Sequence, residues 1–377
     1  MLCHFLQYFL PESKKIKKMD IITLKLLEDK TKIPLDVLRY IDEFNPSLDD
    51  ETIREAIKLW LEDKEECIEE YGHISKWNVR KVKNMSFLFA FNIYFDENLE
   101  EWDVRNVTDM SNMFYHTRNF KGKLERWNVS NVTDMSLMFN CANSFNGNLE
   151  NWNVSNVTDM SLMFNCANSF NGNLEKWNVS NVKNMSLMFD NAISFNGNLE
   201  NWDVSNVLNM HSMFNRATSF NGNLENWNTS NVVSMSYMFQ AATSFNGNLE
   251  KWNTCNVVSM SYMFNGAILF NGNLENWNTS NVTDMSGMFN NASSFKGKLE
   301  NWNTSNVTNM ESMFNNAVLF NGNIENWNVE NVEYIDYMFY GAKSFNRDLE
   351  HWNLLSLEAA SEIFDKSGME KIPSWFE

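Results

Sequence analysis

Apolar residues recur along this chain with a period of 25 residues. One column of the pattern is tryptophan without insertion or deletion, at Trp77, Trp102, Trp127, Trp152, Trp177, Trp202, Trp227, Trp252, Trp277, Trp302, Trp327 and Trp352. A fixed period of about 20 to 50 residues is typical of a solenoid, whose units bury their apolar sides against each other. The pattern therefore predicts twelve stacked repeats rather than several globular domains.

Two spacings alternate inside one repeat. Over 160–167 the sequence places Met, Met, Phe and Ala at i, i+3, i+4 and i+7, which predicts one face of a short helix. Thr158 and Asp159 precede this segment, where a side chain can cap a helix. Asn171 and Gly172 follow it and predict a turn.

After the turn, Leu174-x-x-Trp177-x-Val179 alternates as a half-buried strand does. Each repeat is therefore expected to supply one short strand and one short helix. The predicted fold is an α/β repeat solenoid, a right-handed stack of short parallel strands with the helices on the opposite side.

The predicted core is a set of identical columns. Phenylalanine fills one of them in every repeat, at Phe89, Phe114, Phe139, Phe164, Phe189, Phe214, Phe239, Phe264, Phe289, Phe314, Phe339 and Phe364. The neighbouring methionine stripe has two interpretations, an adaptable binding face or part of the core. Its spacing beside the phenylalanine column favours the core.

The pattern divides the chain into four segments. We expect an N-terminal extension over 1–48, a capping helix within 49–76, eleven complete repeats over 77–351, and a degenerate twelfth repeat with a C-terminal cap over 352–377. Trp375 is expected to fold over the last repeat, because a solenoid end needs a cover.

Charge and composition exclude several classes of function. The net charge of −18 disfavours electrostatic binding to nucleic acid or to an anionic membrane. No run reaches the roughly 18 apolar residues of a membrane span, and 1–18 has the wrong order of charge for a signal peptide. Most repeats also carry Asn-x-Ser or Asn-x-Thr, which the eukaryotic secretory pathway would glycosylate. We therefore expect an intracellular location.

The segment Val-Thr-Asp-Met-Ser-x-Met-Phe, followed by Phe-Asn-x-x-Leu-x-x-Trp, resembles the 25-residue repeat of the BspA-like family, also called the PARCEL repeat. The resemblance covers about residues 49 to 375. It implies membership of the leucine-rich-repeat superfamily, an interaction or surface role, and no catalytic residues. Such proteins occur in mycoplasmas and other bacteria, in protists and in giant DNA viruses. If viral, the chain is expected in the host cytoplasm or the virion, as a particle or surface component.

A second resemblance is confined to 33–44, which is similar to the start of an F-box. An F-box ahead of the repeats would imply a substrate receptor of a ubiquitin ligase. The alternative is a plain helical extension of the cap.

Residues that could carry chemistry are scattered. The five histidines form no repeat column, and none of them is spaced from cysteines as in a zinc site. No nucleophile elbow or phosphate loop is present. Cys141 and Cys166 occupy the same place in neighbouring repeats, so they either approach each other or are two copies of a small half-buried side chain. We expect no enzyme activity, no metal and no cofactor.

Two polar columns form the candidate interaction surface. One is acidic, at Glu100, Glu125, Glu150, Glu175, Glu200, Glu225, Glu250, Glu275, Glu300, Glu325 and Glu350; the other is amide, at Asn128, Asn153 and Asn178. The acidic column is either a track for divalent cations or a basic partner, or a solvated edge, which we favour. The asparagines either form a hydrogen-bonded ladder, which we favour, or a polar face for a glycan or protein.

Near-identical repeats suit a scaffold better than an active site, which needs one individual constellation. The sequence therefore predicts a non-enzymatic scaffold for protein–protein interaction or structural assembly. The partner is a protein that the sequence does not identify, and self-association is open.

Overall fold

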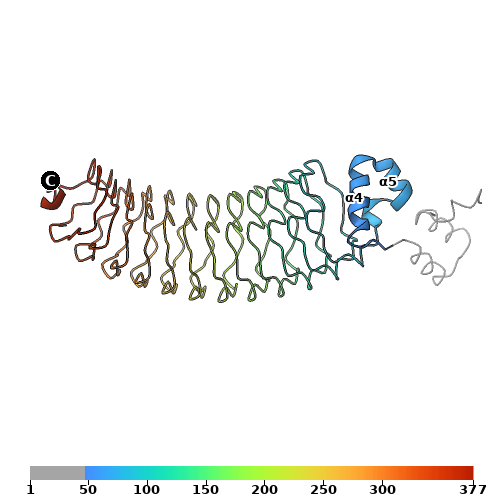
Figure 1. Cartoon of the computed structure of the whole chain (residues 1–377), viewed down its shortest axis with the longest axis horizontal. Coiled ribbons are helices and arrows are strands. Elements are labelled where there is room, and N and C mark those ends of the chain that lie inside the picture. The colour runs from blue at the N-terminus through green and yellow to red at the C-terminus, as the bar shows by residue number, and fades with distance from the viewer. Residues whose placement is uncertain (1–46, 377) are drawn as a thin grey trace, which may run out of the picture.

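The computed structural model describes residues 47–376. Twelve coils of 25 residues stack into an elongated, gently curved array, with two helices at one end and the C-terminus at the other (Figure 1). We number the coils from 1 at Trp77 to 12 at Trp352, and the positions within a coil from 1 at tryptophan. The helices are α4 (Thr52–Glu62), α5 (Lys64–Tyr71), and the 3-10 turns η1 (Ile74–Lys76) and η2 (Ser374–Phe376).

Helix α4 covers the first coil. Its apolar face buries Ile53 and Trp60, and the Trp60 ring meets the Trp77 ring edge-on at 6.0 Å. Arg54 donates to the Ser86 carbonyl oxygen over 2.9 Å. The helix therefore meets both the apolar core and the backbone edge of coil 1.

The predicted α/β solenoid is wrong, beginning with its helices. In coil 4, Met163 N–H donates to the Met160 carbonyl over 3.3 Å, and Asn165 N–H donates to Leu162 over 3.1 Å. These bonds span three residues, whereas an α-helix requires four. Leu162 has a φ of 55°. This left-handed conformation interrupts a right-handed helix.

The predicted strands are also wrong. Trp177 N–H donates to Leu174 over 3.1 Å and Val182 N–H donates to Val179 over 2.9 Å, so the chain turns where a strand would extend. Within 47–376 the structure has no strand and no sheet. The parallel register appears only as isolated bridges at position 8, such as Asp134 with Asp159.

Each coil is instead a succession of turns that return a side chain to the interior about every third residue. Positions 1, 3, 6, 9, 12, 13, 16, 19 and 23 are buried in almost every coil. The predicted phenylalanine and methionine columns lie in this core, which confirms them as core residues. Stacking of identical rings reinforces it, with Phe164 and Phe189 centroids 5.6 Å apart at 6°.

Backbone hydrogen bonds join neighbouring coils in both directions. Position 7 donates to the preceding coil, as Thr158 N–H does to Thr133 over 2.9 Å, whereas positions 9, 11, 13 and 15 donate to the next coil. Leu137, Phe139 and Cys141 donate their N–H groups to carbonyls of the next coil over 2.8–2.9 Å. These donors are alternate residues, so over positions 9–15 every second N–H points toward the C-terminal end of the stack. Each coil can therefore satisfy its backbone only by lying between two others.

The tryptophan column also joins the coils to one another, through a side-chain hydrogen bond to an earlier coil. Trp177 Nε1 donates to the Leu149 carbonyl over 2.9 Å, and the equivalent bond recurs from Trp102 to Trp352. At the C-terminus, Trp375 stacks on Trp352 at 6.2 Å and donates to Leu349 over 2.8 Å. Trp375 thus continues the column, which confirms that it covers the last repeat.

Candidate interaction surface

The glutamate column follows position 23, where the chain turns before each tryptophan. The Glu150 backbone N–H donates to the Asn148 side chain over 3.0 Å, which fixes the start of the turn. The Glu200 carboxylate accepts a hydrogen bond from Asn223 of the next coil over 2.8 Å. Amide donors from the following coil therefore hold carboxylates that would otherwise repel each other.

Cations assist at some coils only. Arg126 lies 3.1 Å from Glu100, Lys176 lies 3.0 Å from Glu150, and Lys251 lies 3.2 Å from Glu225. These three glutamate side chains are 18–29% exposed, so water screens the pairs. Within 47–376 no group of three or more acidic, histidine or cysteine side chains is placed to hold a metal ion.

The asparagine column at position 2 does not form the predicted ladder. Asn153 accepts a hydrogen bond from the Ser155 N–H over 3.1 Å, which is a local Asx turn, and Asn128 and Asn178 do the same. Position 5 makes the contact between coils: Asn156 Nδ2 donates to the Ser130 carbonyl of the preceding coil over 2.7 Å. The amides thus bond the backbone rather than each other.

Two outward positions differ from coil to coil, and the sequence analysis did not single them out. Position 11 carries Phe87, Asn112, Leu137, Leu162, Leu187, Ser212, Tyr237, Tyr262, Gly287, Ser312, Tyr337 and Glu362. Position 15 carries Phe91, His116, Cys141, Cys166, Asn191, Arg216, Ala241, Gly266, Asn291, Asn316, Gly341 and Lys366. Both positions have positive φ throughout the stack. We call these two columns the variable face; comparing the coils with each other would have revealed it.

Aromatic side chains cluster on and beside the variable face. At its N-terminal end Phe87 is 54% exposed and Phe91 is 66% exposed, and Phe91 contacts the Tyr115 ring edge-on at 5.0 Å. Midway along, Tyr237 stacks on Tyr262 at 5.1 Å and 11°. An added Cβ at Gly287 would lie 2.4 Å from the Tyr262 ring, so the absence of a side chain there makes room for the ring.

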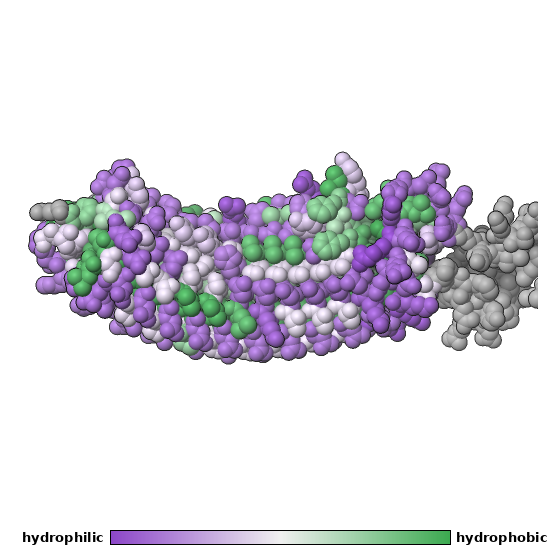
Figure 2. All heavy atoms as spheres, in the orientation of Figure 1, coloured by the Kyte–Doolittle hydropathy of each residue, from purple (hydrophilic) through white to green (hydrophobic). Residues whose placement is uncertain are grey.

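Apolar residues also reach the surface at position 7. Leu208, Val233 and Val258 occupy it in consecutive coils and are 43–48% exposed. Figure 2 shows that apolar side chains on one face gather in short rows that run from coil to coil, between rows of hydrophilic side chains. The surface is thus striped along the stack.

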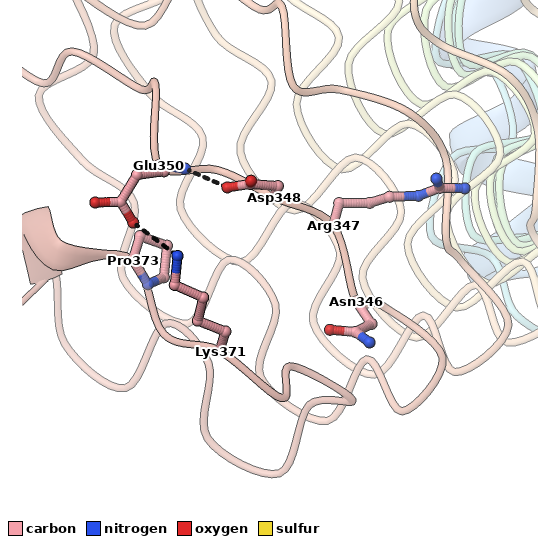
Figure 3. A pocket seen from close by; sticks show the side chains of 6 residues that line it. All are labelled: Asn346, Arg347, Asp348, Glu350, Lys371 and Pro373. Atoms are coloured by element: carbon pink, nitrogen blue, oxygen red, sulfur yellow. Dashed lines mark hydrogen bonds and ion pairs between the residues drawn. The ribbon is translucent and has the colours of Figure 1, made fainter.

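A small hollow lies at the C-terminal end, lined by Asn346, Arg347, Asp348, Glu350, Lys371 and Pro373 (Figure 3). Ser374 N–H donates to the Glu350 carboxylate over 3.2 Å and the Ser374 hydroxyl makes a second hydrogen bond to it. These bonds hold the pKa of Glu350 below its ordinary value. Arg347 donates to the Asn321 carbonyl over 2.8 Å. The polar groups are engaged in fastening the last segment to coil 11.

The repeats identify the family. The model of the family described as "Mycoplasma protein of unknown function, DUF285" matches residues 63–177, 110–218, 166–276 and 268–375. The chain belongs to the DUF285 family. The overlapping matches show that the DUF285 unit is repeated in tandem along the stack. No curated protein matches this DUF285 chain.

Two further expectations concern a membrane span and the F-box-like segment. No helix within 47–376 is long and apolar enough to cross a membrane. The segment 33–44, which resembles an F-box, lies outside the described residues.

Proposed function

We propose that this DUF285 chain is a non-enzymatic scaffold that binds a protein partner through its variable face. The observation that carries the proposal is where the coils differ. Most other outward positions are occupied by bonds that hold the stack together, such as Asn156 to Ser130. The backbone at positions 11 and 15 joins the coils, but the side chains there make few such bonds and change from coil to coil, so they can carry recognition.

The chemistry of the variable face supports a protein partner. Its rings, the exposed Phe87 and Phe91 and the half-buried stacked pair Tyr237 and Tyr262, are of the types enriched in the centres of protein interfaces. Half-buried carboxylates flank the stack, and the whole chain carries a charge of −18. A partner with a basic rim would associate faster with such a surface.

The resemblance to BspA-like repeats adds support, since that family implies an interaction or surface role. The tandem DUF285 matches agree with a protein built for repeated contacts. We extend the proposal to assembly of a particle or surface layer, in which successive coils present related contact sites.

The test is affinity capture from the source cells with paired variants. Tyr237→Asn with Tyr262→Asn removes the stacked rings, and Asn112 at the same position of coil 2 shows that asparagine fits there. The matched control is Asn151→Lys, because Lys176 occupies that position one coil later. We expect the double variant to lose its captured protein at least tenfold while the control retains it. Equal capture by both variants would remove the variable face as the binding surface.

A further inference from the structure

Two cysteines of the variable face lie directly above one another. Cys141 and Cys166 both occupy position 15, in coils 3 and 4, with φ of 56° and 55°. The Cys141 N–H donates to the Asn165 carbonyl over 2.8 Å, which holds the two residues in register. Both side chains are half-buried, so a small reagent can reach the sulfurs.

The two thiols differ in acidity because they share a hydrogen bond. The Cys141 thiol donates to the Cys166 sulfur, and this bond lowers the pKa of Cys166 to about 6 while burial opposes the change. The same bond, together with burial, raises the pKa of Cys141. Asn191 Nδ2 donates a second hydrogen bond to the Cys166 sulfur over 3.5 Å.

Charged groups on coils 2, 5 and 6 also act on the pair. Arg118 lies on the side of Cys141 and Arg216 on the side of Cys166, and both favour a thiolate. Asp190 opposes the thiolate at Cys166. The arrangement gives one nucleophilic sulfur with a second sulfur within hydrogen-bonding reach.

We propose that Cys141 and Cys166 are a reversible redox pair that closes into a disulfide between coils 3 and 4 by exchange with a small-molecule disulfide of the glutathione type. The Cys166 thiolate attacks one sulfur of the reagent, forms a mixed disulfide and releases one glutathione thiolate, which takes a proton from solvent. Once Cys166 is in the mixed disulfide, it no longer accepts the Cys141 hydrogen bond.

The second step then closes the bond. Cys141 attacks the Cys166 sulfur and expels the second glutathione thiolate, which takes the proton that Cys141 loses. Two protein thiols have given up two electrons, and the reagent's disulfide has been reduced to two thiols. The new bond ties neighbouring coils together at the variable face, so it would fix local register and change the surface offered to a partner.

The test equilibrates the full chain with excess oxidised glutathione, blocks remaining thiols, and digests at glutamate. Glu150 lies between the cysteines, so cleavage there leaves them on separate peptides that only a disulfide can join. We expect this joined pair to be the main oxidised product, to disappear with reduced glutathione, and to raise the unfolding temperature. Stable glutathione adducts without the joined pair would overturn the proposal.

Single variants separate the steps. Cys141→Ser should trap glutathione on Cys166, because the resolving thiol is gone, whereas Cys166→Ser should form at least tenfold less adduct on Cys141. Cys255 is the matched control, since it is also half-buried but has Ser230 and Ser280 at its position in the adjacent coils. Equal modification of Cys141 and Cys166 in the two variants, or equal modification of Cys255, would show ordinary surface thiols and contradict the proposal.

Discussion

Asparagine recurs at positions 2, 5, 20 and 22 of most coils, and each of these positions has its own hydrogen-bonding role. In coil 4, Asn153 accepts from the N–H two residues later, and Asn156 donates to the preceding coil's backbone. Asn171 accepts from the backbone of the next coil over 2.8 Å, and Asn173 accepts from Glu175 N–H over 3.0 Å. The abundance of asparagine therefore reflects a backbone that makes few regular bonds within each coil.

Positive φ is the residue-level cost of this fold. Gly266 stands at position 15 with φ of 69°, and an added Cβ would meet nothing closer than 3.7 Å, at Ala241. Gly266→Ala should therefore lower the free energy of unfolding by about 1 kcal/mol through backbone strain alone. Gly266→Asn should lose less, since asparagine tolerates this conformation. Urea denaturation measures both.

The control for that prediction is Asn265→Ala, one residue earlier with ordinary φ. It should change the free energy of unfolding by less than about 0.5 kcal/mol. If Gly266→Ala were equally mild, strain at position 15 would not be a significant term.

Acidity of Cys166 should be visible in its alkylation. The rate with iodoacetamide should rise with pH through a midpoint at about 6 and then level off, because only the thiolate reacts. Cys141→Ser keeps a hydroxyl donor and should keep the low midpoint, whereas Cys141→Ala removes the donor and should move it upward. Mass spectrometry of the alkylated peptide from pH 5 to 9 gives the rates. The same midpoint in both variants would refute the hydrogen bond as the main cause.

At the level of one coil, the sequence predicts which residues face inward but not the backbone that turns them there. The spacing over 160–167 fits a helix, and it fits consecutive three-residue turns equally well, because both return side chains to one side. The distinguishing signal was present: Gly266, Gly287 and Gly341 would fall inside the expected helices, where glycine is unfavourable. The three-residue spacing of apolar positions also continues from Ala167 to Phe170, past the end of the segment predicted as a helix.

The candidate site was predictable in part for the same reason. The glutamate column follows from the period alone, but the sequence predicts a strand for Leu174-x-x-Trp177, whereas the structure turns there. The donors that hold Glu200 lie 23 residues away, on Asn223, so only the stacking distance of the coils brings them together. Positions 11 and 15 fall inside the predicted helix over 160–167, and that prediction gives no sign that both have positive φ.

A half-buried carboxylate, Asp190, interrupts the amide row at position 14. Asp190 accepts hydrogen bonds from Asn165 and Asn215, each over 2.9 Å, but burial dominates and raises its pKa. A carboxyl whose pKa is higher in the folded state binds protons more readily there, so its contribution to stability falls as pH rises from about 4 toward neutral. Asp190→Asn should remove this loss.

The measurement is the unfolding midpoint of wild type and Asp190→Asn between pH 3.5 and 7. The variant should gain on the wild type steadily as pH rises, whatever constant offset the altered hydrogen bonds introduce. Asp203→Asn, a replacement of an exposed acid, serves as the control for the loss of one negative charge. A gap independent of pH would contradict burial as the cause of the raised pKa.

The glutamate column should not bind calcium specifically. Amide donors already occupy the carboxylate of Glu200, and calcium needs six to eight convergent oxygens rather than one per coil. Millimolar calcium should therefore change the unfolding temperature no more than sodium at the same ionic strength. A saturable rise with calcium that Glu200→Gln and Glu225→Gln abolish would make the column a cation site.

Across the whole molecule, the stack has a direction. The N–H groups at positions 9, 11, 13 and 15 of each coil point toward the next coil, so over positions 9–15 the first coil offers carbonyls and the last offers donors. Arg54 of α4 meets the first end at Ser86. At the other end, within 47–376, the N–H groups of Glu362, Phe364 and Lys366 form no hydrogen bond. Although Trp375 covers Trp352, the backbone of the C-terminal coil over positions 9–15 is therefore held on one side only, and this coil should open first.

The difference between an end coil and a central coil gives a prediction about how cooperatively the stack unfolds. Trp202 lies between Trp177 and Trp227, stacked at 6.3 and 6.4 Å, and is 3% exposed. Trp202→Ala should cost about 3–5 kcal/mol by leaving a cavity. Because each coil is stabilised mainly by its two neighbours, the array should then unfold in two steps, one on each side of the lesion.

Trp352→Ala creates a similar cavity in the last coil and serves as the matched comparison. It should release coil 12 and the segment that Trp375 fastens while leaving the main transition close to that of the wild type. Hydrogen exchange should show lost protection confined to residues beyond about 340 in this variant, but centred on coils 5 to 7 in Trp202→Ala. If both variants unfolded in a single step with equal losses of stability, coupling would extend over the whole stack. Only long-range cooperativity makes a cavity in an end coil as destabilising as one in a central coil.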